Sequence, residues 1–187
     1  MQYNSCIRFF IMNLFILDQD PVKAAEYYQD LHVNKIIIEG AQMLANAYPK
    51  ERLAEADCPR TAKGTPRTWG FPAHPMAKWA RENQSNFEWS LKHIKALCKE
   101  FAFRQGKRHF TEDFIDWVEN NKPKLKQEQQ TEQPQCFVTY YPHCIVPGDP
   151  VQGYRNYYNA AKKSFEFKFG QVEATWTKRN KPFFFEG

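Results

Sequence analysis

The clearest pattern of apolar and polar positions lies in residues 32–44, HVNKIIIEGAQML. Three consecutive isoleucines, residues 36–38, indicate a segment that is buried over most of its circumference. At about 100° per residue, four polar side chains fall within an arc of roughly 80° on one side of the expected helix. A narrow polar stripe between apolar walls is typical either of a solvent-exposed helix face or of the floor of a cleft. The stripe consists of His32, Lys35, Glu39 and Gln42.

The sequence around this stripe predicts one long helix, or two short ones, over about residues 21–48. Asp18 or Asp20 is a suitable N-cap, and Pro21 suits the first turn, where an amide hydrogen is not needed. The Glu39 side chain lies one turn after Lys35 and two turns after His32, so either neighbour could keep the carboxylate ionised through charge or hydrogen bonding. Gln42 could then orient a base edge or a water molecule.

An apolar run precedes this helix, in residues 9–17. It is too short to span a membrane, so we expect a buried strand or an extended lead-in segment. The sequence MNLFILDQDP makes a natural beginning, and we therefore expect Met12 to be the biological start. Residues 1–11 are then an N-terminal extension.

A second long helix is predicted over residues 76–106, ending at Gly106. Packed against the first helix, it could set His32 and Glu39 opposite two polar residues of its own and so form a shared polar site. The alternative is that both polar borders are structural. The border of the second helix consists of Asn86, His93, Glu100 and Arg104.

The remaining sequence predicts a mainly α fold for residues 12–187, in a single domain with two long packed helices and several shorter ones. Proline and glycine indicate structured loop rather than helix at 49–75. We expect two short helices, at 109–121 with Thr111 as N-cap and at 149–164. Residues 121–135 should form a polar low-complexity excursion. A C-terminal β-hairpin is expected at 165–177, with its turn near Gly170.

Charge and aromatic content suit an anionic partner such as nucleic acid. The net charge is +5, the sequence pI is about 8.9, and aromatic residues make up 16% of the chain. Basic residues interleaved with aromatic ones are typical of surfaces that hold a backbone and a stacked base, although each cluster alone also fits a solvated surface. The residues that we assign to nucleic-acid binding are Lys35, Gln42, Arg60, Lys63, Arg67, Arg104 and Arg155.

The five cysteines contain no CxxC pair, which favours free thiols in a reducing, intracellular compartment. Cys58, Cys136, His143 and Cys144 match no zinc-binding spacing. His32 and Glu39 are seven residues apart, which is not the spacing of a di-metal helix bundle. We therefore expect no metal and no other cofactor, and nothing indicates a membrane segment or an obligate protein partner.

Residues 74–111 resemble a stretch of the pyrimidine-dimer DNA glycosylases, the endonuclease V family. In that family a histidine also precedes the catalytic glutamate by seven residues, as His32 precedes Glu39. The features that carry the resemblance are, in order, His74–Pro75, Trp79, His93, Glu100, Arg104–Gln105–Gly106 and His109.

A second resemblance covers nearly the whole chain from Met12. The chain is similar to a set of uncharacterised phage proteins that begin MNLFILD-DP and carry HV-K---E-AQ. For a phage-encoded protein, the expected location is the host cytoplasm or nucleoid. This resemblance implies no particular activity.

The glycosylase resemblance implies a helical fold around a lesion in double-stranded DNA. It implies that an N-terminal α-amine attacks the sugar C1′ and forms a Schiff base, while Glu39 stabilises the charged sugar and helps β-elimination. Processing at Met12 would expose Asn13 as the residue that carries this amine. His32, His93 and Glu100 complete the catalytic set. Residues 38–42, IEGAQ, stand where the family has an arginine-rich stretch.

Three functions remain open. The first is a DNA glycosylase/AP lyase, or a related nucleic-acid enzyme, acting on damaged or modified pyrimidines with Glu39 at its centre. The second is a non-catalytic nucleic-acid-binding protein that uses the same basic and aromatic surface. The third is an enzyme that acts on free nucleotides or modified bases in the same cleft.

Overall fold

The structure is a computed structural model that describes residues 13–137, 139–162, 164–167 and 170–186, with only the backbone described for the strand residues up to 171. The expected extension, residues 1–11, lies outside the described residues. The fold is mainly helical, as the sequence predicts. Its helices within the described residues are α1 (Pro21–Glu26), α2 (Asp30–Ala45), α3 (Lys50–Ala54), α4 (Pro75–Ala80), α5 (Gln84–Gln105), α6 (Glu112–Asn120), the short 3₁₀ helix η1 (Pro142–Cys144) and α7 (Pro150–Ala161).

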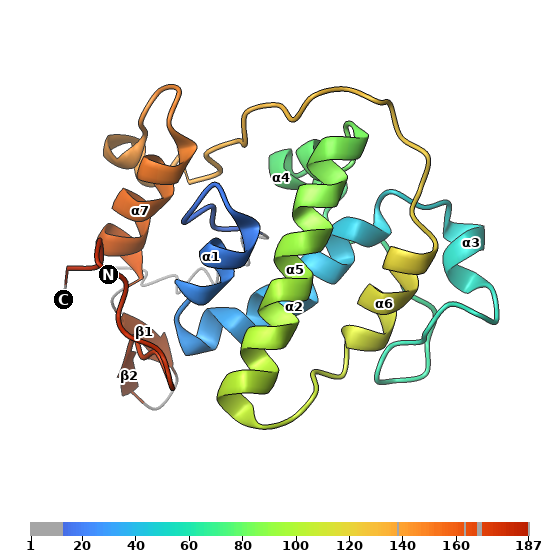
Figure 1. The fold of residues 1–187 in the computed structure, drawn as a ribbon, viewed down its shortest axis with the longest axis horizontal. Coiled ribbons are helices and arrows are strands. Elements are labelled where there is room, and N and C mark those ends of the chain that lie inside the picture. The colour runs from blue at the N-terminus through green and yellow to red at the C-terminus, as the bar shows by residue number, and fades with distance from the viewer. Residues whose placement is uncertain (1–12, 138, 163, 168–169, 187) are drawn as a thin grey trace, which may run out of the picture.

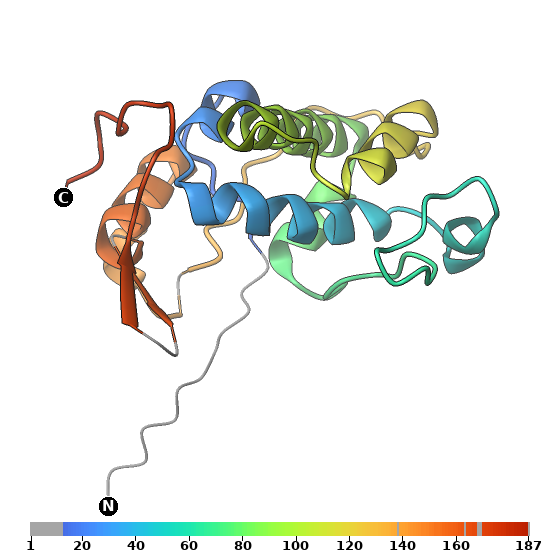
Figure 2. The ribbon, with the colours of Figure 1, turned by 90° about the horizontal axis from the view of Figure 1, so that it is seen from below.

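The two long helices, α2 and α5, cross in the middle of the molecule. Figures 1 and 2 show α1, α5 and α6 in one layer and α2 beneath it, with α7 at one end and α3 at the other. The apolar side chains between the layers are almost fully buried, which removes a large apolar area from water. They include Leu14, Ile36, Ile37, Phe87, Ile94 and Phe114.

Residues 21–48 form two helices, one of the two predicted alternatives, and the predicted second long helix is also divided in two. The first breaks after α1, whose N-cap is Asp20: its side chain accepts a hydrogen bond from the Val22 amide at 2.8 Å. The second breaks between α4 and α5, where the Asn83 side chain caps α5 by accepting from the Asn86 amide at 2.9 Å. Gly106 ends α5 with a φ of 69°, a left-handed conformation that glycine adopts without strain.

Other boundaries differ in smaller ways from the predictions. The loop expected at 49–75 contains the five-residue helix α3. Residues 13–17 are extended and buried, but they form no strand. The helices α6 and α7 begin after Thr111 and Asp149; Asp149 caps α7 through the Gln152 amide, whereas Thr111 makes no side-chain cap.

The C-terminal strands are short. Strand β1 (Ser164–Phe167) pairs antiparallel with β2 (Gly170–Glu173), in a register that sets Ser164 opposite Glu173. A hairpin of the expected length, over residues 165–177, is not supported. The second strand ends before Trp176, which instead packs on Phe185 and donates its indole N–H to the Tyr27 carbonyl at 2.9 Å. Residues 168–169, where the expected turn falls, lie outside the described residues.

The polar segment 121–135, which we call the strap, runs in extended form across the start of α5 (Figure 1). The Gln84 amide donates to the Lys126 carbonyl at 2.8 Å, and the Ser85 hydroxyl donates to the Glu128 carbonyl at 2.7 Å. Asn86 accepts from the Thr131 amide at 3.0 Å. These bonds hold a segment whose composition alone predicts a solvated excursion.

Candidate active site around Glu39

Glu39 is nearly buried, with 9% of its surface exposed, and it lies between two nitrogen donors. Its Oε2 accepts a hydrogen bond from the backbone N–H of Asn13 at 3.3 Å. Its Oε1 lies 3.4 Å from Nζ of Lys35, one helical turn earlier. Burial raises the pKa of the Glu39 carboxyl, while the charge of Lys35 and the Asn13 hydrogen bond oppose this rise. The carboxylate is therefore suited to holding or releasing a proton.

Asn13 reaches Glu39 because the extended segment after it is anchored in the core by Leu14, Ile16 and Leu17. The Tyr154 hydroxyl donates to Oδ1 of Asn13 at 2.8 Å. The Asn13 side chain is 1% exposed, yet its Nδ2 has no hydrogen-bond partner among the described residues. A buried donor without a partner is costly, so this amide is available to a ligand or a water molecule.

His32 contributes through aromatic packing and not through charge. Its Nδ1 lies 2.6 Å from the Tyr158 hydroxyl, and its ring stacks on Phe15 with 4.6 Å between centroids. Burial lowers the pKa of His32 well below its ordinary value, and the charges of Lys162 and Lys35 lower it further. The ring is therefore neutral at physiological pH. A neutral His32 ring supplies no charge to Glu39, whereas Lys35 forms an ion pair with the Glu39 carboxylate. That His32 keeps Glu39 ionised through a hydrogen bond stays a prediction.

Lys162, the residue that follows α7, belongs to the same cluster. Its Nζ lies 5.1 Å from the centroid of the Tyr157 ring and 5.8 Å from that of Phe15. Burial and the nearby charge of Lys35 lower the pKa of Lys162 to about 8, with the Glu39 carboxylate opposing the change. The sequence places Lys162 in a basic and aromatic patch but gives it no part in the site. Its spacing of four and eight residues from Tyr158 and Tyr154 could have indicated a common helix face.

We refer to this group of side chains as the Glu39 cluster. Its open side is marked by Lys35, whose side chain is 45% exposed, whereas the tyrosines behind it are buried. Tyr28 joins the cluster through its hydroxyl, which lies 2.6 Å from the Phe15 amide nitrogen. The members of the Glu39 cluster are Asn13, Phe15, Tyr28, His32, Lys35, Glu39, Tyr154, Tyr157, Tyr158 and Lys162.

The two polar residues predicted to face this cluster from the second helix have other partners. The two ring nitrogens of His93 have partners other than Glu39. Nδ1 donates to the Pro21 carbonyl at 2.8 Å, and Nε2 lies 3.1 Å from the Tyr28 hydroxyl. Burial lowers the pKa of His93 to about 4. Glu100 pairs with Arg104 at 3.0 Å and with Arg179 at 2.5 Å. Glu100 therefore belongs to a separate ionic cluster.

Arg104 is not available to nucleic acid, contrary to the prediction from its charge. The residue is 4% exposed, and its guanidinium donates to the carbonyls of Tyr28 at 2.6 Å and Glu26 at 2.9 Å. It also pairs with Asp30 at 3.1 Å. A planar group with five N–H donors suits this task, since it joins the end of α1, the start of α2 and α5.

Two further arginines of the predicted surface are also engaged within the fold. Arg155 donates to the Leu17 carbonyl at 2.9 Å and lies over the ring of Phe184. Arg67 donates to the Pro59 carbonyl at 3.2 Å and lies over the ring of Phe114. Both interactions direct the guanidinium inward, so these residues stabilise loops and are poorly placed to bind a phosphate backbone.

The basic loop nevertheless lies beside the helix that carries Glu39. Gln42 and Ile38 of α2 line a depression of about 310 Å³ together with loop residues that include Lys63. Lys63 is exposed, and so is Arg60, which donates to the Ala54 carbonyl at 3.0 Å. Gln42 thus faces this depression and not the Glu39 carboxylate. Of the predicted basic residues, Lys35, Arg60 and Lys63 keep an exposed position.

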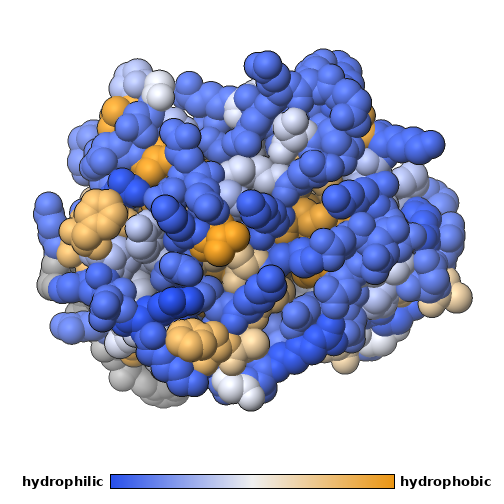
Figure 3. Space-filling view, in the orientation of Figure 1, coloured by the Kyte–Doolittle hydropathy of each residue, from blue (hydrophilic) through white to orange (hydrophobic). Residues whose placement is uncertain are grey.

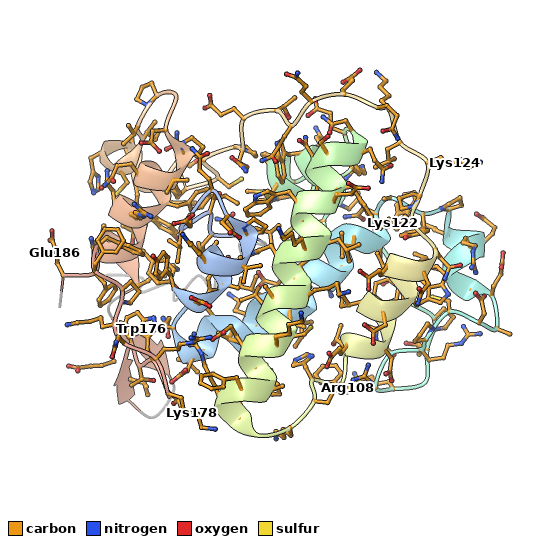
Figure 4. The ribbon with its side chains drawn as sticks, viewed as in Figure 1. Arg108, Lys122, Lys124, Trp176, Lys178 and Glu186 are labelled. Carbon is orange, nitrogen blue, oxygen red and sulfur yellow. The ribbon has the colours of Figure 1, made fainter. Side chains whose placement is uncertain are left out.

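A second groove, of about 660 Å³, follows α5 on the opposite layer. Apolar patches lie there among charged side chains in Figure 3, and Val22, Leu91 and Phe103 are among the lining residues. Several of the charges that border it are paired, Lys95 with Glu119, Lys122 with Glu88 and Arg179 with Glu100, and the groove is also lined by Lys92 and Lys99. Figure 4 shows the labelled cations Arg108 and Lys178 along one edge of this face, separated from Lys122 and Lys124, which follow the end of α6. They form no single patch that would follow a phosphate backbone.

Within the described part of the chain, no group of three or more histidine, cysteine, aspartate or glutamate side chains could hold a metal ion. The cysteines there, Cys58, Cys98, Cys136 and Cys144, are free thiols. No helix among the described residues has both the length and the apolar character needed to cross a bilayer.

Comparison with models of protein families, with curated proteins and with solved structures gives no match. The class of site therefore follows from its own geometry. A nearly buried carboxylate lies beside a backbone nitrogen and Lys35, against a wall of buried aromatic rings, and its charge acts on the amine of Lys162. Such an arrangement is suited to proton transfer and to chemistry that begins with an amine.

Proposed function

We propose that the protein is a DNA glycosylase/AP lyase that acts on damaged or modified pyrimidines, with Glu39 as its acid/base. The observation that supports it best is the carboxylate of Glu39, nearly buried and placed beside the nitrogen atoms of Asn13 and Lys35. Glycosylase/lyase chemistry requires these two kinds of group together. An amine attacks the sugar, and a carboxylate then moves the proton that allows the strand to break.

The reaction assigns a separate step to each group. An amine nitrogen bonds to C1′ as the bond between C1′ and the base breaks, and the base leaves with the electron pair and takes up the proton that the amine loses. The C1′–O4′ bond of the sugar then breaks, O4′ takes up a proton from water, and the nitrogen lone pair forms the C=N bond. The resulting iminium ion is positively charged, so an adjacent carboxylate stabilises it. Glu39 then accepts a proton from C2′, and the bond from C3′ to the phosphate oxygen breaks. Water hydrolyses the remaining imine and restores the amine.

Two nitrogens of the Glu39 cluster can become this amine. The backbone nitrogen of Asn13 becomes a primary α-amine in a chain processed to begin there, as the glycosylase resemblance implies, and α-amines have a pKa near 8. The second is Nζ of Lys162, which needs no processing. In either case Lys35 and the exposed loop residues Arg60 and Lys63 supply positive charge on the side of α2 toward which a DNA backbone would lie.

Borohydride trapping tests the proposal. Chains that begin at Met1, Met12 and Asn13 are incubated with duplex DNA that carries an abasic site, and with ultraviolet-irradiated and intact duplexes. Because borohydride reduces an imine to a stable amine, we expect a covalent protein–DNA adduct with abasic and irradiated DNA but none with intact DNA. Absence of an adduct from every chain and every duplex contradicts the proposal.

An enzyme that acts on free nucleotides or modified bases is the second candidate. It is favoured by the inward engagement of Arg67, Arg104 and Arg155, which leaves few of the predicted basic residues for a duplex. Salt dependence separates the two candidates. Binding to a duplex through several phosphates weakens steeply between about 50 and 200 mM salt, whereas binding of a single nucleotide changes much less.

A further inference from the structure

We infer that Nζ of Lys162 is the amine that forms the Schiff base, so that activity does not depend on removal of the residues before Asn13. This inference rests on the proposed function. Asn13 then has a positioning role: its backbone N–H holds the Glu39 carboxylate, and its side chain holds the substrate. Lys162 is then the catalytic nucleophile and Glu39 the proton acceptor.

The position of Lys162 follows from the register of α7. Tyr154 and Tyr158 lie two turns and one turn before it on the same helix face. Their hydroxyls contact the cluster directly, at 2.8 Å from Asn13 Oδ1 and 2.6 Å from His32 Nδ1. The face of α7 that carries Tyr154, Tyr158 and Lys162 therefore packs against the rest of the cluster.

The backbone of Lys162 is fixed while its side chain extends toward the aromatic wall. Its N–H donates to the Tyr158 carbonyl at 3.0 Å, and its carbonyl accepts from Nε2 of Gln29 at 3.4 Å. Its Nζ lies over the rings of Phe15 and Tyr157. Because Phe15 also stacks on His32, one helical turn before Lys35, the amine shares its surroundings with the stripe on α2. A nucleophile needs such a fixed position.

Attack on C1′ requires a neutral amine, and the surroundings of Lys162 favour that form. Its pKa is lowered to about 8 because burial disfavours the ammonium ion and the charge of Lys35 repels it. At pH 7.5 about a quarter of such a group is neutral, against roughly one part in a thousand for a lysine with the ordinary pKa near 10.4. Glu39 acts on the same group in the opposite direction, which shows that the carboxylate and the amine are electrostatically coupled.

The other nitrogens of the cluster fit this role less well. In any chain that retains Met12, the Asn13 nitrogen is an amide and is not nucleophilic. Lys35 forms an ion pair with Glu39 and has a side chain that is 45% exposed, the opposite of the desolvated environment that activates a lysine. Lys35 instead tunes the site, because its charge acts on both Lys162 and Glu39.

The first experiment locates the trapped amine. The chain beginning at Met1 is reduced with borohydride on abasic duplex DNA, digested, and sequenced by mass spectrometry. We expect the adduct on Lys162, and we expect Lys162→Arg to reduce trapping more than 100-fold while the control Lys92→Arg, an exposed substitution on α5, leaves it unchanged. An adduct on Lys35 or on an α-amine overturns the assignment to Lys162 and leaves the proposed function standing. No adduct on any chain overturns both.

The second experiment needs no DNA. The side-chain carbons next to the lysine amines are followed by NMR as the pH is raised, with the Lys162 signal assigned from Lys162→Arg. We expect a midpoint near 8 for Lys162. Lys35→Met should raise that midpoint and Glu39→Gln should lower it, because the first removes a repelling charge and the second an attracting one. A midpoint above 10 that neither substitution moves overturns the inference.

Discussion

Gly40 of α2 lies directly against Ile94 of α5 where the two long helices cross. A Cβ atom at Gly40 would come within 2.6 Å of both Cγ1 and Cδ1 of Ile94, closer than carbon atoms approach in folded proteins. The absence of a side chain at Gly40 therefore sets the distance between the helices. Glu39 is the preceding residue, so the same contact fixes the depth at which its carboxylate lies.

Gly40→Ala should destabilise the protein, although alanine is the better helix former by about 1 kcal/mol. Overpacking at the crossing should outweigh that gain and give a net loss of about 1–3 kcal/mol in the free energy of unfolding. Urea denaturation measures it. The double variant Gly40→Ala/Ile94→Ala should lose less than the sum of the single variants, because removing the isoleucine side chain makes room for the new Cβ. Additive losses would show that the two residues are not in contact.

Glu39→Gln should abolish strand cleavage without harming the fold, while the Schiff base that precedes cleavage can still be trapped. Glutamine has the same shape and keeps an oxygen that can accept from Asn13, but it cannot take a proton from C2′. Because the pKa of Glu39 is raised in the folded protein, its stabilising effect is complete below the unfolded pKa and is lost as the pH rises through the folded pKa. At pH 7.5 we therefore expect Glu39→Gln to equal the parent protein in stability within about 1 kcal/mol, or to exceed it. Full activity in a folded Glu39→Gln protein excludes Glu39 as the acid/base.

Acid should destabilise the protein between about pH 6.5 and 4, in part through His93. Its pKa of about 4 in the folded state lies below the ordinary 6.5, so the stability that it contributes is present above 6.5 and is lost as the pH falls. From pH 7.5 to 5 this amounts to about 2 kcal/mol for one such histidine. Urea denaturation at both pH values measures the loss in the free energy of unfolding on going from pH 7.5 to 5. In His93→Gln this loss should be smaller than in the parent protein by about that amount. The control His143→Gln, at an exposed position, should leave the difference unchanged.

Arg104→Met should lower stability strongly and should not act through DNA. The substitution leaves Glu100 and Asp30 with fewer partners and removes the donors to two carbonyls, which together cost about 3–5 kcal/mol. Lys99→Met, an exposed substitution on the same helix, should change stability by less than about 0.5 kcal/mol. If Arg104→Met does not fold, Arg104→Lys should show a smaller loss. Equal melting temperatures for Arg104→Met and the parent protein would contradict a structural role.

The strap should exchange its amide hydrogens slowly where Asn86 holds it. The Asn86 side chain accepts from the Thr131 amide at 3.0 Å and donates to the Thr131 hydroxyl at 2.8 Å. Asn86→Ala should therefore speed exchange at Thr131 by about tenfold or more, as expected for the loss of roughly 1.4 kcal/mol or more of local stability. Asn120→Ala, which removes a bond to Asp116 within α6, serves as the control. Exchange at the rate of an unfolded peptide in the parent protein would instead support the mobile excursion that the composition predicts.

Helical periodicity was sufficient to predict the main elements, because it depends on residues close in the sequence. It predicted the helix that carries Glu39, the contact between Lys35 and Glu39, and the helix that begins after Asp149. The breaks between consecutive helices were harder to predict from the sequence. The α4–α5 break depends on the side chain of Asn83, whose capping bond cannot be distinguished in advance from a polar position within a continuous helix.

Burial of charged side chains could not be predicted, because it depends on partners far away along the chain. Arg104 donates to a carbonyl 76 residues earlier, and Arg155 to one 138 residues earlier. Composition records both as positive charges and gives no indication that they are buried. Lys162 was overlooked for the same reason, since its lowered pKa arises from α2 and from the packing around Phe15.

The contribution of α7 to the Glu39 cluster has a consequence for synthesis of the chain. A ribosome releases Asn13, His32 and Glu39 early, but Tyr154, Tyr158 and Lys162 are made more than 100 residues later. A nascent chain that stops before Asp149 carries the carboxylate without the α7 tyrosines or the half-buried Lys162 that complete the cluster. The Glu39 cluster is therefore assembled only after α7 has been made, and a chain that stops earlier would lack the amine that we propose as the nucleophile.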